Sequence, residues 1–413
     1  MSLLGPISTL GRWREEAFNV DFLGGRLPVG ATLSRAGSAL YWDADGRLRT
    51  AGENEPQFEY DANGRPCGLL LEPQSTNMVN YSNDALHSSW VVSGATKTGG
   101  YEAPDGTPTG VRIDPVGGSV AGLYKGFTLS PLAASITLSV YIKPIPGQLG
   151  QLAFTMRNDT RSTTISPYGY FSTETMSVSG GAEYWSVQRC PRGWYRMIGV
   201  FPTTNYQAGD QLRFYWGSTS ASPRPAFIVH GMQAEARANA TSLIPTADVG
   251  GVSRALSMVS IPTPLFYRPD VGGALLIEAV PLGPPAADGD LGYLAVMNDG
   301  TNGNRVGIYT RRDSGGVFKV QAVVTTGGST IISTTSPTMA NLYDGRPLKM
   351  GVNFGASGAE SWVNGTAIAS SSSSALPVAP TVLELRKTGQ TGFYYRTLRY
   401  YDKAVDMATL TAR

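Results

Sequence analysis

Several aromatic side chains stand near turns and polar donors, an arrangement that suits sugar binding. Saccharides present apolar C–H faces and hydroxyl edges, so a flat ring beside an amide or guanidinium donor matches both. We expect a carbohydrate site drawn from Tyr184, Trp185, Tyr206, Trp216, Arg311 and Trp362. Tyr184 and Trp185 are favoured because they follow a Gly-Gly turn. Core packing of any single ring stays open as an alternative, and Trp194, in GWYR, is expected to be core.

The acidic residues do not show the pattern that sugar cleavage needs. Glycoside hydrolysis uses two carboxylates held roughly 5–10 Å apart, but the nearest cluster, Glu53-Asn54-Glu55-Pro56, is broken by proline. We expect that cluster to be a solvated turn. No Gly-x-Ser-x-Gly nucleophile motif is present. His230 is expected to pack within a strand and His87 to lie in a polar loop, so the sequence predicts a protein that is not an enzyme.

Two loops rich in acidic residues are candidate binding sites for one metal ion, Ca²⁺. The loop AADGDLG offers Asp288 and Asp290, and MNDGTNGN offers Asp299. Oxygen-rich loops suit the hard cation Ca²⁺, whereas Asp-Gly pairs also simply form turns. A structural Ca²⁺ and plain turns therefore remain alternatives, and no other cofactor is expected.

Composition restricts the class of protein. The chain has 413 residues with 15 % charged, 10 % aromatic, 50 Gly and 27 Pro, which favours turn-rich β structure over disorder. A net charge of +2 argues against a nucleic-acid binder. No apolar run is long enough to insert into a membrane, and the N-terminus lacks a signal-peptide pattern. We therefore expect the protein to be made and assembled in the cytoplasm, with Cys67 and Cys190 reduced.

Alternating apolar and polar residues predict two series of strands. The clearest is SITLSVYIKP, in which Ile136, Leu138, Val140 and Ile142 share one face, as in a half-buried strand. The first series continues through 151–156, 193–201, 211–217 and 226–235. The second comprises 274–280, 305–312, 317–326, 329–335, 348–354, 359–370, 381–387 and 393–402, with an Asn364-Gly365 hairpin turn. Helix is expected only near 10–18 and 405–411.

The fold class predicted is all-β, with two tandem antiparallel β-sandwiches. We expect residues 1–30 to be an attachment segment that exposes Trp13 and Phe18. Residues 31–250 should form a first sandwich that includes an N-terminal hairpin with a turn at Asp45-Gly46. Residues 251–271 are expected to be an extended connector, because Pro and Gly interrupt them, and 272–413 a second sandwich.

These segments resemble known families. The runs LSRAGSALYWDADGRLRT and EPQFEYDANGRPCGLLLEPQSTNMVNYSNDALHSSW, followed by TLSVYIKP, GWYR and GMQAEA, are similar to a module of tailed-bacteriophage tail fibre and spike proteins. That family implies a jelly-roll like carbohydrate-binding modules. The segments LKMGVNFGASGAESWVNGTAIAS and GFYYRTLRYYDKAVDMATL resemble laminin-G-like, concanavalin-A-like domains.

The resemblance implies a non-catalytic virion protein that binds host-surface glycans, either lipopolysaccharide or capsule. Its partners would be other phage virion proteins and further copies of itself, for example in a trimer, although no apolar heptad run indicates a stalk. Two alternatives remain. One is a purely structural baseplate, collar or capsid-decoration protein, and the other, which the scattered acids disfavour, is a glycan depolymerase.

Overall fold

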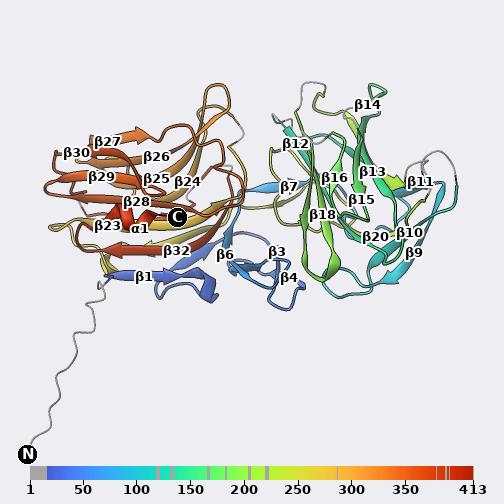
Figure 1. The fold of residues 1–413 in the computed structure, drawn as a ribbon, viewed down its shortest axis with the longest axis horizontal. Coiled ribbons are helices and arrows are strands. Elements are labelled where there is room, and N and C mark those ends of the chain that lie inside the picture. Colours follow the sequence, from blue (N-terminus) through green and yellow to red (C-terminus); the bar gives the residue numbers. More distant parts are fainter. Residues whose placement is uncertain are drawn as a thin grey trace, which may run out of the picture.

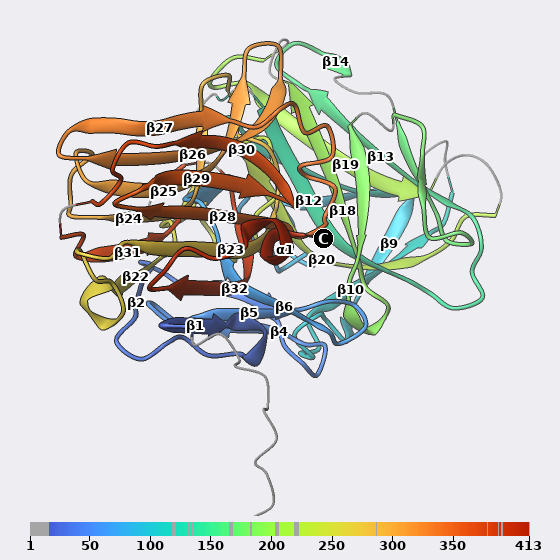
Figure 2. The ribbon, with the colours of Figure 1, turned by 60° about the vertical axis from the view of Figure 1, so that its left-hand side comes forward.

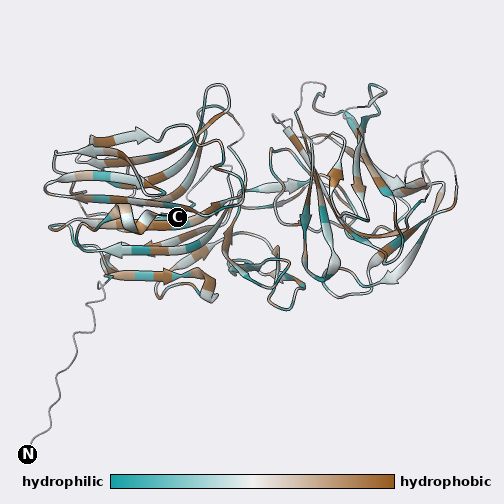
Figure 3. Cartoon of the chain, viewed as in Figure 1, coloured by the Kyte–Doolittle hydropathy of each residue, from teal (hydrophilic) through white to brown (hydrophobic). Residues whose placement is uncertain are grey.

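The computed structural model describes residues 16–412 apart from 118–120, 131–132, 134, 165–167, 182–183, 203–205, 219–222, 286, 378, 387 and 390. Strands make up 51 % of the chain and helices 4 %, which confirms the predicted all-β class. The described strands form two sandwiches that lie beside each other (Figure 1). Apolar and polar residues alternate along many strands (Figure 3), because each large sheet buries one face against its partner.

The terminal sandwich is named here for the two ends of the chain that build it. Its first sheet has eight strands, β30 (Thr366–Ser371), β29 (Gly358–Val363), β28 (Leu348–Gly355), β23 (Gly273–Pro281), β32 (Phe393–Tyr401), β6 (Pro66–Leu71) and β5 (Gln57–Tyr60), with β1 (Phe18–Asp21) also paired to β32. Its second sheet has seven, β2 (Thr32–Ser34), β22 (Met258–Pro262), β31 (Val382–Leu385), β24 (Leu291–Asn298), β25 (Arg305–Asp313), β26 (Val317–Thr326) and β27 (Ser329–Thr335). Figure 2 shows the two sheets stacked.

In the sequence, the strands of the inserted sandwich lie between β6 and β22 of the terminal sandwich. One sheet has six strands, β17 (Trp185–Arg189), β18 (Tyr195–Pro202), β12 (Ser135–Pro144), β20 (Phe227–Glu235), β10 (Gly110–Pro115) and β9 (Ala95–Tyr101). The other has seven, β16 (Val178–Ser179), β15 (Gly169–Ser172), β13 (Gln151–Asn158), β19 (Gln211–Ser218), β11 (Ala121–Thr128) and β8 (Trp90–Ser93), with β14 (Thr163–Thr164) paired to β13. A continuous apolar core separates the sheets.

The chain passes between the sandwiches twice, along a two-stranded antiparallel ribbon. β7 (Ser75–Asn77) enters the inserted sandwich and pairs with β21 (Val252–Arg254), which leaves it. The predicted domain boundaries are therefore wrong. Phe18 pairs with Tyr400, so the described part of the predicted attachment segment contributes a strand, β1, to a sandwich. The predicted connector contains β21 and β22. Alternation along one segment identifies a strand but not its partner, which here lies hundreds of residues away.

A small hairpin fills the space beside the inserted sandwich. β3 (Ala39–Trp42) pairs with β4 (Leu48–Ala51), and Leu40, Trp42 and Leu48 form a satellite core with Tyr141 and Trp194. The hairpin therefore covers the outer face of β12. That strand was predicted to be half-buried, but Tyr141 on its supposed solvent face is 2 % exposed.

Two hairpins use the same turn. In residues 43–47 the side chain of Asp43 accepts the backbone N–H of Arg47 at 2.7 Å, and in residues 61–65 Asp61 accepts that of Arg65 at 2.9 Å. In both turns a glycine takes a positive φ, 71° at Gly46 and 74° at Gly64, which a side chain would disfavour. The Asp45-Gly46 turn is thus confirmed, and its counterpart joins β5 to β6.

The helix predicted near the end of the chain is confirmed, whereas the helix predicted near its start can be compared with the structure only from residue 16 on. α1 (Met407–Thr411) begins at an Asp406 cap, as predicted for 405–411. Most of the helix predicted at 10–18, with Trp13, lies outside the described residues. Phe18 begins β1 instead, and its ring stacks on Phe266 at 4.7 Å, so it is not the exposed residue that was expected.

Two smaller expectations can also be compared with the structure. Cys67 and Cys190 are free thiols rather than a disulfide pair, as predicted. Within the described part of the chain, no helix has the length and apolarity needed to cross a membrane.

Candidate functional site

Three of the predicted sugar-binding aromatics lie in the core. Trp185 is 3 % exposed, Tyr206 5 % and Trp216 0 %. The ring of Trp185 packs 5.1 Å from that of Phe201, and Trp216 meets Trp90 edge to face at 5.4 Å. A buried ring cannot serve as a stacking platform, so this part of the predicted site is wrong. The Gly-Gly turn before Trp185 suggested a loop, but its strand turns the ring inward.

The other three predicted residues are not brought together. Tyr184 is half-buried in the inserted sandwich, stacked on Phe201 at 5.8 Å. Arg311 lies on β25 and pairs with Asp313. Trp362 lies on β29, in the other sheet of the terminal sandwich, and packs against Met407 and its neighbours. No single surface could use all of them.

The acidic loops behave as turns. Asp288 accepts from Arg312 Nε at 2.8 Å and from a backbone N–H at 3.0 Å, while Asp290 accepts the backbone N–H of Ala287. Asp299 accepts the backbone N–H and, at 2.6 Å, the hydroxyl of Thr301. Within the described ranges, no three His, Cys, Asp or Glu side chains gather as metal ligands. The structure therefore favours the turn alternative over Ca²⁺.

A cleft of about 660 Å³ lies where the two sandwiches meet. The terminal sandwich contributes β5, β6 and β32, and the inserted sandwich contributes β12, β17 and β18. The β3–β4 hairpin lies between them (Figure 1). The lining of the cleft mixes aromatic rings with hydrogen-bonding groups, among them Trp42, Glu59, Tyr141, Arg196, Asn239 and Tyr394. Sequence reasoning did not group these residues.

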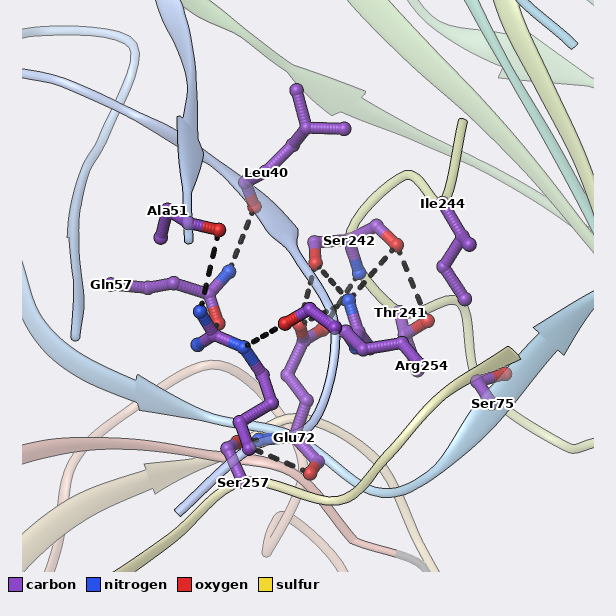
Figure 4. Close-up of polar contacts among 12 residues, drawn as sticks. Leu40, Ala51, Gln57, Glu72, Ser75, Thr241, Ser242, Ile244, Arg254 and Ser257 are labelled. Atoms are coloured by element: carbon purple, nitrogen blue, oxygen red, sulfur yellow. Dashed lines mark hydrogen bonds and ion pairs between the residues drawn. The ribbon is translucent and has the colours of Figure 1, made fainter. Parts of the chain in front are cut away.

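A buried ion pair lies where the chain crosses between the sandwiches, and one of its partners, Glu72, lines the cleft. Arg254 Nη1 lies 3.0 Å from Glu72 Oε2, with side-chain exposures of 1 % and 5 %. Ser242 donates to the same carboxylate from its backbone N–H at 2.7 Å and from its hydroxyl at 2.6 Å (Figure 4). Burial alone would raise the pKa of Glu72, but Arg254 and Ser242 hold it below its ordinary value.

A second polar layer fixes the rim at residues 238–242. Thr241 donates to Glu235 from its hydroxyl at 2.6 Å, and Ser75 on the ribbon donates to the same carboxylate at 2.5 Å. Arg196 donates to the Thr241 carbonyl at 2.6 Å, and its guanidinium lies 5.3 Å from the centre of the Tyr141 ring. This network holds the rim against β18, so the cleft has a fixed shape.

Glu59 is the most unusual group in the cleft. It is 8 % exposed, its Oε2 has no hydrogen-bond partner in the described structure, and the backbone N–H of Trp42 bonds to its carboxyl. Burial, reinforced by the negative charge of Glu72, raises the pKa of Glu59 to about 8. The carboxyl is therefore protonated at neutral pH. Arg196 Nε, also buried, lacks a partner too.

In β5 the burial alternates so that Gln57 and Glu59 are buried while Phe58 and Tyr60 are half-exposed. Phe58 packs on the core of the terminal sandwich, so Gln57 and Glu59 lie on the opposite face of the strand, beneath the β3–β4 hairpin. This alternation is that of an ordinary half-buried strand, so it did not reveal that the polar face is covered, and buried polar groups require partners. Gln57 finds them, since it donates to the Leu40 carbonyl at 2.9 Å and accepts from Arg35. Glu59 keeps one oxygen free.

Known proteins resemble the chain only at the level of fold. No protein-family model matches, and no curated protein does. The CBM22-1 xylan-binding domain of Paenibacillus barcinonensis Xyn10C is similar, at 15 % identity over 42 % of this chain and 94 % of that domain, with a TM-score of 0.26. The tandem CBM22-1–CBM22-2 domain of the same protein covers 80 % of this chain and 97 % of its own, at 12 % identity and 0.26.

A further similar structure is the CBM40 of the Ruminococcus gnavus IT-sialidase. It is 12 % identical over 35 % of this chain and 85 % of that domain, with a TM-score of 0.26. Scores and identities this low concern the β-sandwich fold alone and carry no argument about the ligand.

Proposed function

We propose that this chain is a non-catalytic virion protein of a tailed phage, of the tail fibre or spike type, which binds host-surface glycans in the cleft between its sandwiches. The observation that carries glycan binding is the cleft itself. It has a fixed shape and aromatic walls, and two of its buried polar groups, Glu59 Oε2 and Arg196 Nε, have no partner among the described residues. A buried polar group without a partner costs free energy, which a ligand rich in hydroxyls would recover.

The virion role is supported by the sequence resemblance alone. Such a protein would be displayed in several copies beside other virion proteins. A single sugar site binds weakly, in the millimolar to high micromolar range or roughly −4 to −6 kcal/mol. Several copies together raise the effective affinity by about two to four orders of magnitude. This is why we propose a homo-oligomer on the virion surface.

The absence of catalysis is also part of the proposal. Glu72 is buried, and its carboxylate is engaged by Arg254 and Ser242, so it is not free to act beside Glu59 as a second catalytic acid. Asp61 accepts two backbone N–H groups in its turn, as its counterpart Asp43 accepts that of Arg47.

A purely structural role is the second candidate. The two chain crossings and the buried ion pair between them would suit a rigid spacer between virion parts. Binding of the purified chain to a bacterial polysaccharide array, in a multivalent form, separates the two. The glycan-binding proposal predicts saturable binding to at least one glycan without other virion proteins, and no binding to any glycan would replace it with the structural role.

The virion role has its own test. Antibodies raised against the chain should label tails or capsids in electron micrographs of particles from the strain that encodes it. Particles that lack the protein by labelling and by mass spectrometry would contradict the virion assignment, whatever the glycan array shows.

A further inference from the structure

The unpartnered oxygen of Glu59 indicates what kind of group the cleft accepts. One carboxyl oxygen receives the N–H of Trp42, so in the neutral acid the proton lies on the other oxygen, Oε2. Oε2 is then a buried donor that needs an acceptor. Arg196 Nε is a second donor without a partner in the described structure. The cleft therefore lacks acceptors, which hydroxyl, ether or amide oxygens of a ligand could supply.

The electrostatic field at Glu59 restricts the charge of that ligand. The negative charge of Glu72 outweighs the positive charge of Arg196 in raising the pKa of Glu59. A ligand carboxylate placed against Oε2 would meet the same burial and the same repulsion. An anionic sugar is disfavoured there for the reason that Glu59 itself stays neutral.

We propose that the cleft selects uncharged saccharides, with a sugar oxygen accepting a hydrogen bond from the protonated carboxyl of Glu59. This rests on the proposed glycan-binding function and names its ligand class. The mixed lining suits it, since Trp42, Tyr141 and Tyr394 offer ring surface and Asn239 offers an amide. A glycan with a free carboxylate would have to turn that group away from Oε2.

Most of the other titratable groups around Glu59 keep one charge state between pH 6 and 9. Burial raises the pKa of Cys67 and of Cys190 to about 12. Burial likewise raises the pKa of the phenols that interact electrostatically with Glu59, which are Tyr41 from β3, Tyr141 from β12 and Tyr394 from β32. Glu72, with its depressed pKa, stays an anion and Arg196 stays a cation. The change of charge expected at this point in that range is that of Glu59, so binding should weaken as pH rises past about 8.

The test is a pH titration of glycan binding by the full chain. The probes are neutral gluco-, manno-, xylo- and galacto-oligosaccharides, compared with oligogalacturonates and sialylated oligosaccharides. We expect neutral probes to bind at pH 7 and to lose affinity by a factor on the order of ten or more by pH 9.5, as the protonated fraction falls. Acidic probes should bind more weakly than neutral ones at both pH values.

Two variants assign the effect to this residue. Glu59→Gln keeps one acceptor for the Trp42 N–H and one donor for the ligand, so it should bind at pH 7 within about threefold of the parent. Its affinity should stay level up to pH 9.5, because no proton is lost. Glu59→Leu lacks the donor, so it should bind neutral probes at least about tenfold more weakly at pH 7, with melting curves confirming that it folds.

The outcomes distinguish a failure of the inferred role of Glu59 from a failure of the proposed glycan-binding function. If no probe binds at any pH, the proposed glycan binding fails. If neutral probes bind but the parent chain shows a level pH profile, or acidic probes bind best, glycan binding stands and the role of Glu59 is overturned. A Glu59→Gln variant that falls with pH as steeply as the parent also overturns it.

Discussion

The guanidinium of Arg254, where the chain leaves the inserted sandwich, lies 3.0 Å from the carboxylate of Glu72, where the chain approaches it. The pair therefore joins the two crossings between the sandwiches, beside the β7–β21 ribbon (Figure 4). Glu72 also receives the backbone N–H of Ser242 from the cleft rim. One ion pair thus couples the relative placement of the sandwiches to the shape of the cleft.

Removing one partner of this pair should destabilise the protein strongly. Arg254→Ala leaves the Glu72 carboxylate buried without its counter-charge, which costs about 3–5 kcal/mol in comparable pairs. Chemical denaturation should show this loss. Arg49→Ala, which breaks the exposed pair with Asp43, is the matched control and should leave the midpoint nearly unchanged. Equal effects of the two substitutions would show that the buried pair has no special role.

The aromatic residues first suggested for sugar binding should prove to be core residues. Trp185→Ala and Trp216→Ala each leave a large cavity, and we expect a loss of about 3–5 kcal/mol in the free energy of unfolding. Tyr168→Ala is the surface control, since Tyr168 is 40 % exposed. A Trp185→Ala protein that keeps its melting temperature but loses glycan binding would restore the original assignment.

Glu59 should make stability fall as pH rises. Its pKa is about 8 in the folded protein and near 4.5 when unfolded, so between these values only the unfolded chain releases the proton. Unfolding then becomes easier by at most about 1.4 kcal/mol per pH unit. Glu59→Gln removes this term, so the stability of the variant relative to the parent should increase from pH 5 to pH 8. Parallel stability curves would show that Glu59 ionises normally.

His230 should act in the opposite direction at acidic pH. Burial lowers its pKa to about 4, so between pH 6.5 and 4 the unfolded chain takes up a proton that the folded protein refuses. Stability should therefore fall as pH decreases through this window. His230→Gln removes this dependence, and thermal melts of both proteins from pH 7 to pH 4 measure it. A variant that loses stability with acid as steeply as the parent would exclude His230 as the cause.

Local patterns in the sequence predicted the strands well. The alternation in 348–354 corresponds to β28, and the Asn364-Gly365 turn is confirmed, with φ of 47° and 81°. Such features depend on residues that are neighbours in the chain. The pairing of Phe18 with Tyr400 joins residues far apart in the chain. Periodicity therefore could not predict that one sandwich is inserted into the other, nor where the domain boundaries lie.

The candidate site was missed for the same reason. The cleft gathers residues from Leu40 to Arg396, which meet only because the chain crosses twice between the sandwiches. Composition pointed to exposed rings near turns, yet Trp216 is fully buried in the core of the inserted sandwich. In β5 Phe58 faces the core and Gln57 and Glu59 face away from it, so the local alternation did not indicate that the polar face is covered by the hairpin.

The most direct test of the account is to fill the cleft without removing any of its contacts. Ala240 lines the cleft at the fixed rim, and Ala208 is exposed on a turn of the inserted sandwich. The measurement is multivalent binding of Ala240→Trp and Ala208→Trp to a glycan that the parent binds, with melting curves for both. The account predicts that Ala240→Trp loses binding while folding normally and that Ala208→Trp binds like the parent. Unchanged binding by a folded Ala240→Trp protein would contradict it.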